Sequence, residues 1–191
     1  MCTFSFHRMK TIVSYFIATG FGSGYSKYMP GTIGTLWAWI MFLILDYLFI
    51  DIALFIIILI TFIVGIATSG FVEDHLKKKD ASEIVIDEIV AFWLILFFLP
   101  RLDESLPTTQ AIDYSYLFIQ IQAFVIFRFF DIFKVWPTNI IDKKVRGGLG
   151  IMLDDIIAAL QTLFVLSIFF RFGLNHNLPG YESFLWKEMT F

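Results

Sequence analysis

The sequence predicts an all-α protein: a compact bundle of about five membrane-spanning helices, preceded by a short N-terminal helix at the membrane interface. Three observations lead to this fold class. Hydrophobic residues make up 58% of the chain and charged residues only 16%, whereas soluble domains are about half apolar and about a quarter charged. The apolar residues also gather into long runs. The length of 191 residues suits one domain covering 1–191.

Each expected helix corresponds to one apolar run. A crossing helix needs about 20 mostly apolar residues, so the second and fifth runs are long enough and the first and third are somewhat short. A shorter segment, 11–20, is expected to lie at the interface or to dip into it. The five runs are 33–49, 52–72, 84–100, 116–137 and 150–170.

The basic residues predict the orientation. With the N-terminus inside, ten of the 14 lysines and arginines fall on cytoplasmic segments. This agrees with the positive-inside rule, by which cytoplasmic loops carry an excess of lysine and arginine. The net charge of −3 gives no basic patch of the kind that binds nucleic acid. The single cysteine, Cys2, excludes an intrachain disulfide framework and a cysteine metal cage. The oligomeric state is not readable from the sequence.

Five carboxylates fall on one side of this predicted topology. Asp87 and Glu88 begin the third helix, Asp131 lies near the end of the fourth, and Asp154 and Asp155 begin the fifth. A charge deep in the bilayer costs about 2.5–3.5 kcal/mol on insertion scales, so such residues usually face the bundle interior and serve function. A second interpretation holds for either pair alone, because carboxylates also favour the positive end of a helix dipole.

A divalent cation would relieve the repulsion among these acids. None of the three histidines lies in a motif, so the ligands are oxygen atoms, which suit Mg²⁺. Adjacent helical residues point about 100° apart, so one acid of each pair is expected to ligate metal while the other supports it. The candidate catalytic and metal-binding residues are Asp87, Glu88, Asp131, Asp154 and Asp155.

Basic residues accompany the acid of the fourth helix. Arg128, Asp131 and Lys134 recur at i, i+3 and i+6 and so lie on neighbouring positions of one helix face. One interpretation is that Lys134, and Arg128 beside it, bind a phosphate group. The other is a plain ion pair, and Arg128, the deeper of the two, suits it better.

Glycine-rich turns precede two of the helices. "GFGSG" and "GGLG" allow backbone N–H groups to approach an anion, so Gly22, Ser23, Gly24 and Thr32 are candidate phosphate-binding residues. Neither turn has the spacing of a known nucleotide-binding loop. Close helix packing is the alternative for the glycines, and helix capping is the alternative for the two hydroxyl residues.

Four segments together resemble a known family. "FGSGYSKYMPGTIGT", "IVIDEIVAFW", "FRFFDIFKVWP" and "DKKVRGGLGIMLDDIIAA" are similar, in order and spacing, to the blocks of bacterial phosphatidylglycerophosphatase A. The resemblance covers about 20–159. It implies a Mg²⁺-dependent phosphatase of the bacterial inner membrane that converts phosphatidylglycerophosphate to phosphatidylglycerol in phospholipid synthesis. The orientation predicted from the basic residues places the site on the cytoplasmic side. The residues it implies as important are Gly22, Gly24, Pro30, Gly31, Thr32, Asp80, Asp87, Glu88, Arg128, Asp131, Lys134, Asp142, Asp154 and Asp155.

The chain departs from the family pattern at three positions. Lys27 and Val135 stand where the family has proline, and Ala91 stands where it has glycine. The first two changes leave the backbone shape near the site less certain, but they do not alter the chemistry.

The implied reaction is hydrolysis of a phosphomonoester by a water activated at magnesium, with Asp155 or Glu88 orienting that water. An aspartyl-phosphate intermediate is the open alternative. A different class, a small transporter or ion pathway that uses intramembrane carboxylates, predicts acids spread through the bilayer depth. The clustering of the acids on one side disfavours that class.

Overall fold

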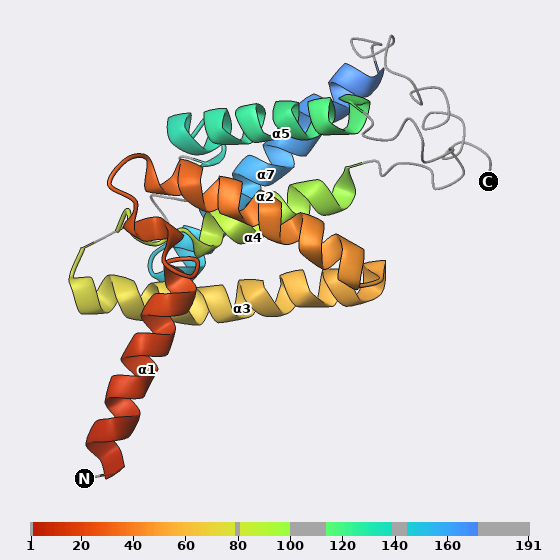
Figure 1. The fold of residues 1–191 in the computed structure, drawn as a ribbon. Helices are drawn as coiled ribbons and strands as arrows, with labels where there is room; N and C mark the ends of the chain where they lie inside the picture. Colours follow the sequence, from red (N-terminus) through yellow and green to blue (C-terminus); the bar gives the residue numbers. More distant parts are fainter. Residues whose placement is uncertain (1, 79–80, 100–113, 139–144, 172–191) are drawn as a thin grey trace.

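The computed structural model describes residues 2–78, 81–99, 114–138 and 145–171. Every regular element in these ranges is a helix, which confirms the all-α prediction (Figure 1). The five apolar runs correspond to five helices whose ends shift by a few residues. In chain order the elements are α1 (Cys2–Ala18), the short 3₁₀ helix η1 (Ser23–Tyr25), α2 (Pro30–Leu48), α3 (Asp51–Leu76), α4 (Ile86–Phe98), α5 (Tyr114–Phe133) and α7 (Gly148–Arg171).

Three of the described helices, α2, α3 and α7, are long and apolar enough to cross a membrane. The expected number of five spans is therefore not established by length and apolarity. α4 has 13 residues, and at about 1.5 Å per residue it extends only about 20 Å, less than the hydrocarbon core. α5 has 20 residues but carries Arg128 and Asp131 near its end, which lowers its apolar character.

α4 occupies the centre of the bundle. It packs against α2, α3, α5 and α7, and most of its residues are buried, including Val90, Phe92 and Leu96. A helix enclosed on all sides is apolar all round, which explains why its sequence shows no polar stripe. The first turn of α4 is the exception, because Asp87 and Glu88 lie there.

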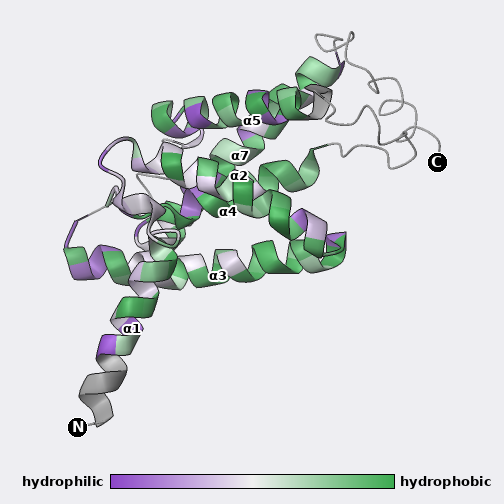
Figure 2. Cartoon of the chain, in the orientation of Figure 1, coloured by the Kyte–Doolittle hydropathy of each residue, from purple (hydrophilic) through white to green (hydrophobic). Residues whose placement is uncertain are grey.

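The outer surfaces of the long helices are apolar. Figure 2 shows hydrophobic residues along most of α2, α3 and α7, with hydrophilic residues gathered toward the helix ends and the connecting loops. Exposed large side chains include Ile40 and Leu43 on α2 and Ile60 and Ile63 on α3. A surface of this kind is typical of helices that face lipid rather than water.

The chain reversals bring one end of each helix to the same end of the bundle. The starts of α2, α4 and α7 and the ends of α3 and α5 lie there together, and the α2–α3 turn lies at the opposite end (Figure 1). The convergence that the topology predicted for the polar segments is thus present in the structure.

α1 is longer than the expected segment 11–20, and it runs across the direction of the other helices (Figure 1). It packs against α3. Its exposed face carries four apolar side chains that are each at least half exposed: Met9, Ile12, Val13 and Phe16. Their i, i+3, i+4, i+7 spacing forms one apolar stripe. This geometry suits a helix that lies along the membrane surface at the same end of the bundle as the polar segments.

Close contact between α3 and α7 depends on glycine. A Cβ atom on Gly148 would lie 1.9 Å from the carbonyl oxygen of Ile66 and 2.7 Å from the backbone nitrogen of Gly70. The absence of a side chain at Gly148 therefore lets the first turn of α7 rest directly on the backbone of α3. This contact sets the position of α7, and with it that of Asp154 and Asp155.

Candidate active site

A pocket opens at the end of the bundle where the helix ends converge. Its volume is about 400 Å³, and α2, α3, α4, α5 and α7 all contribute residues to its lining. Six carboxylates and two basic groups line it, so the formal charge of the described lining is negative by four. The charged lining residues are Glu73, Asp87, Glu88, Arg128, Asp131, Lys134, Asp154 and Asp155.

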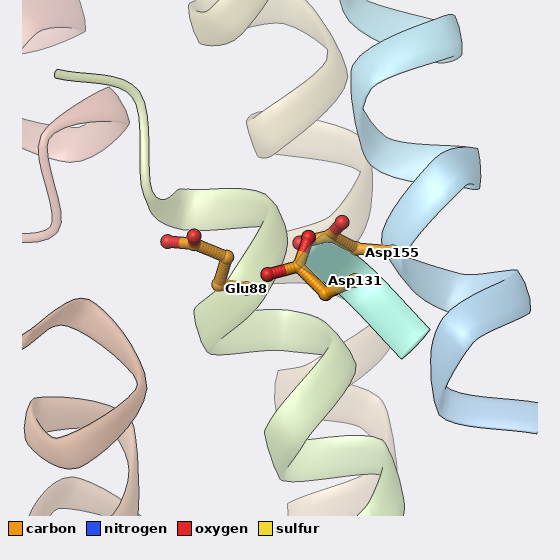
Figure 3. Close-up of side chains that lie close together, drawn as sticks. All are labelled: Glu88, Asp131 and Asp155. Atoms are coloured by element: carbon orange, nitrogen blue, oxygen red, sulfur yellow. The ribbon is translucent and has the colours of Figure 1, made fainter. Parts of the chain in front are cut away.

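Three of the carboxylates form a cluster. Glu88, Asp131 and Asp155 each offer an oxygen atom, and these oxygens lie within 4.8 Å of one another. The three side chains come from three helices, α4, α5 and α7 (Figure 3). Glu88 Oε2 and Asp155 Oδ2 are buried and have no hydrogen-bond partner in the described part of the chain. Buried carboxylate oxygens in that state are uncommon in proteins, and their chemistry fits a bound cation.

Arg128 holds two members of this acidic cluster. Its Nη1 lies 2.6 Å from Asp131 Oδ2 and 3.1 Å from Glu88 Oε1. The same nitrogen lies 3.5 Å from the hydroxyl of Thr35, which donates to the carbonyl of Gly31. One guanidinium among three carboxylates leaves two negative charges, the complement of a divalent cation. Arg128 is thus an ion-pair partner of the acids, as its depth indicated.

Lys134 approaches the pocket from the end of α5. Its ammonium donates to Asp154 Oδ2, and its side chain is 31% exposed, against 14% for Arg128. The backbone of Lys134 is left-handed, with φ 43°. This conformation costs a residue other than glycine about 1–2 kcal/mol. Strain of this kind tends to accumulate at functional sites.

Adjacent acids in each predicted pair have different surroundings. Glu88 and Asp155 belong to the acidic cluster, whereas Asp87 and Asp154 line the pocket outside it. The angle of about 100° between neighbouring helical positions accounts for this separation. Of the five acids predicted as ligands, the structure therefore brings three into mutual contact and leaves two beside them.

The glycine at the start of α2 makes room for the cluster. A Cβ atom on Gly31 would lie 1.8 Å from Glu88 Oε1 and 3.0 Å from Arg128 Nη2. The carboxylate of Glu88 therefore rests against the backbone of α2. Pro30 and Thr32 line the pocket on either side of Gly31.

The preceding glycine-rich turn lies elsewhere. Gly22, Ser23 and Gly24 are not among the residues that line the pocket. The hydroxyl of Ser23 donates to the carbonyl of Gly20 at 2.9 Å, and a Cβ atom on Gly24 would lie 2.1 Å from the carbonyl oxygen of Glu83. The turn thus packs on the segment before α4. Phosphate binding by the three residues stays a prediction. Asp80 and Asp142 lie outside the described residues.

Glu73 is a lining residue that the sequence interpretation missed. It lies in the last turns of α3 and is half-buried. The available signal was its position: α3 ends on the same side of the predicted topology at which α4 and α7 begin. Locally, "FVEDHLKKK" resembles an ordinary charged helix end, which gives no sign that its glutamate faces a pocket.

Comparisons with known proteins agree with this architecture. The family model for phosphatidylglycerophosphatase A matches residues 16–170. A phosphatidylglycerophosphatase A of Escherichia coli is 30% identical over 86% of this chain and 85% of its own length, and that of Haemophilus influenzae is 33% identical over 80% and 85%. A putative phosphatidylinositol-3-phosphatase of Bacteroides thetaiotaomicron is 34% identical over 80% of this chain and 90% of its own. No solved structure matches the chain.

A helical membrane bundle with a pocket of acids and bases at one end, and with these relatives, is a phosphoric monoester hydrolase by class. Every residue proposed for the site lies within the matched segment. The chain belongs to the phosphatidylglycerophosphatase A family, which confirms the resemblance found in its sequence motifs.

Proposed function

We propose that this protein hydrolyses the phosphomonoester of phosphatidylglycerophosphate, releasing phosphatidylglycerol and inorganic phosphate, in phospholipid synthesis at the cytoplasmic face of a bacterial inner membrane. The observation that carries the proposal is the acidic cluster of Glu88, Asp131 and Asp155 beside Lys134, in a pocket at the end of a membrane bundle. Family membership supplies the substrate.

The acidic cluster fits Mg²⁺. Its donors are all carboxylate oxygens, which hard divalent cations prefer, and two of those oxygens have no hydrogen-bond partner in the described chain. We propose that Glu88, Asp131 and Asp155 hold the ion. When bound, Mg²⁺ supplies positive charge that neutralises the phosphate and activates water.

The remaining charged residues act on the substrate and on one another. Lys134 is the more exposed of the two cations, and its ammonium is available to the phosphate oxygens, where it stabilises the negative charge of the transition state. Asp154 holds Lys134 in the pocket. Arg128 keeps the carboxylates of Glu88 and Asp131 oriented. Phosphate thus binds between the acidic cluster and the ammonium.

Exposed aromatic residues support a site at the level of the lipid headgroups. Tyr28 directly precedes the pocket residues at the start of α2, and Trp136 follows Lys134 by two positions. Tyr28 is 83% exposed and Trp136 70%. Tyrosine and tryptophan concentrate at the membrane–water interface, so a lipid phosphate reaches the pocket without leaving the bilayer.

A transporter or ion pathway is the competing function. Such a protein needs polar groups through the bilayer depth, whereas the charged residues of the described α4, α5 and α7 gather at one end, apart from Arg171 at the far end of α7. This distribution favours a site over a pathway.

Phosphate release by the purified protein in lipid vesicles tests the proposal. We expect release from phosphatidylglycerophosphate, loss of release in EDTA and recovery on addition of Mg²⁺. Phosphatidylinositol 3-phosphate is the matched comparison, because one relative carries the name of a putative phosphatase for that lipid. Faster release from the inositol lipid would overturn the substrate assignment, and undiminished release in EDTA would overturn the cation.

A further inference from the structure

Gln161 of α7 forms hydrogen bonds with the turn that follows α5. Its Nε2 donates to the carbonyl of Trp136 at 2.9 Å, with a longer contact of 3.4 Å to the carbonyl of Val135. Its Oε1 accepts a hydrogen bond of 2.8 Å from the hydroxyl of Thr138. One half-buried amide therefore joins three residues of the turn to α7.

The chemistry of these partners fixes the orientation of the amide. Backbone carbonyls only accept hydrogen bonds, so the NH₂ group must face Trp136 and Val135. The oxygen must then face Thr138, whose side chain is 1% exposed and has no access to water. The match between donors and acceptors is specific to glutamine: leucine offers neither, and glutamate offers two acceptors.

The turn held in this way begins at Lys134. The left-handed backbone of Lys134, at φ 43°, ends α5 and directs the next residues toward α7. That conformation is unfavourable for lysine, so contacts outside α5 must maintain it. The amide of Gln161 supplies such contacts one and two residues after Lys134.

Asp154 holds the ammonium of Lys134, and Gln161 holds the turn that follows this residue. Asp154 and Gln161 are seven residues apart, about two helical turns, and so lie on one face of α7. Asp154 binds the ammonium, and Gln161 binds the carbonyls of the two residues that follow Lys134. A single face of α7 therefore contacts both the ammonium of Lys134 and the turn that begins at its backbone.

We propose that Gln161 is a positioning residue for Lys134, holding the turn in the one conformation that presents the ammonium to the pocket. Gln161 does not line the pocket itself. The proposal rests on the proposed function, in which Lys134 contacts the phosphate of the substrate.

The test compares Gln161→Leu with Gln120→Leu. Gln120, a glutamine of α5, accepts a hydrogen bond of 2.7 Å from Trp39 Nε1 of α2 and does not line the pocket. The same substitution thus removes a hydrogen bond to a distant segment at both sites. We expect Gln161→Leu to lower kcat/KM for phosphate release about tenfold, because a shift of about 1 Å at a binding group has large kinetic effects. We expect Gln120→Leu to change it less than about twofold.

Two further measurements separate positioning from general damage. Vanadate is an oxyanion that mimics the phosphoryl group in the transition state. Its inhibition should weaken about tenfold in Gln161→Leu and stay unchanged in Gln120→Leu. In a Lys134→Met background, followed by single-turnover phosphate release, Gln161→Leu should cause no further loss. Residues that act through one group are non-additive in this way.

The outcomes are distinct. An inactive wild-type protein would refute the proposed function. An active wild type in which the two leucine variants behave alike, or in which Gln161→Leu still lowers the rate after Lys134 is removed, would overturn the positioning role. A milder but parallel loss in Thr138→Val would support it, because Thr138 orients the amide.

Discussion

Asp155 lies where repulsion among like charges is concentrated. It is 5% exposed and shares the acidic cluster with Glu88 and Asp131, while Arg128 pairs with those two carboxylates. Without a cation the third negative charge opposes folding. In the proposed Mg²⁺ site, Asp155 therefore connects the stability of the protein to binding of the ion.

Replacing Asp155 by asparagine separates these effects. In EDTA we expect Asp155→Asn to unfold at a higher temperature than the wild type, because one of the repelling charges is gone. Saturating Mg²⁺ should stabilise the wild type by about 2.7 kcal/mol at 100 times its Kd, and the variant much less. Thermal unfolding with and without Mg²⁺ measures both.

The matched control is Asp74→Asn, on the exposed side of α3 and outside the pocket. It should keep the full response of the wild type to Mg²⁺. Equal stabilisation of Asp155→Asn and the wild type by Mg²⁺ would remove Asp155 from the proposed ligand set.

The absence of a side chain at Gly31 leaves room for the carboxylate of Glu88. In Gly31→Ala the new methyl group would meet Glu88 Oε1 at 1.8 Å, so the flexible carboxylate moves and the acidic cluster is distorted. We expect phosphate release to fall about tenfold or more, with only a small loss of folded protein. Gly65→Ala is the control, since its methyl group meets the flexible end of Met152 at 2.8 Å, in the α3–α7 packing. Equal activities of the two variants would contradict this role for Gly31.

At the scale of elements, the sequence predicts the helices well and their membrane role less well. The five apolar runs locate α2, α3, α4, α5 and α7 within a few residues, because apolar length is a local property. The number of membrane spans cannot be read from the same local property. α4 is as apolar as a spanning helix, but the reason is enclosure by four other helices, and a linear pattern does not distinguish a helix surrounded by protein from one surrounded by lipid.

The α3–α7 contact gives a prediction at this scale. Gly148→Ala places a methyl group 1.9 Å from the carbonyl oxygen of Ile66, and a backbone atom cannot rotate away. We expect a loss of about 1–3 kcal/mol in the free energy of unfolding, measured by thermal or denaturant unfolding in detergent. Leu149→Ala, at the next and exposed position of α7, should cost much less. A neutral Gly148→Ala would show that α7 has freedom to move away from α3.

At the scale of the whole molecule, the convergence of five helix ends gives an orientation that can be measured. Asp74 lies at the pocket end, and Ile50, 72% exposed, lies in the turn at the opposite end. In a Cys2→Ser background, which removes the single native thiol, an impermeant maleimide should label Asp74→Cys only in inside-out vesicles. It should label Ile50→Cys only in right-side-out cells.

This result follows from the excess of basic residues on the predicted cytoplasmic side. Labelling of both positions from one side would mean that α2 and α3 do not cross the bilayer as a pair. Labelling in the reverse sense would put the pocket on the outer face and overturn the proposed cytoplasmic site.

The sequence predicted five of the six acids that line the pocket, but not which of them lie close together. One-sided placement of Asp87, Glu88, Asp131, Asp154 and Asp155 followed from topology alone, because helix ends alternate between the two sides. Which acids meet was not predictable, since it depends on the rotation of each helix about its axis. That rotation is set by packing between distant parts of the chain.

The same reason explains the residues that were overlooked. The role of Gln161 depends on a turn more than twenty positions earlier in the chain, and a polar residue on an otherwise apolar helix gives no local sign of its partner. Glu73 reaches the pocket only because α3 ends beside α4 and α7.

The three carboxylates of Figure 3 come from three different helices, and none of these helices carries the set alone. The cluster therefore forms only when α4, α5 and α7 have packed together. Arg128 already pairs with the acids of α4 and α5, and the docking of α7 adds the third carboxylate, Asp155. If the proposed function holds, a substitution that displaces one of these helices is expected to lower phosphate release before it unfolds the protein.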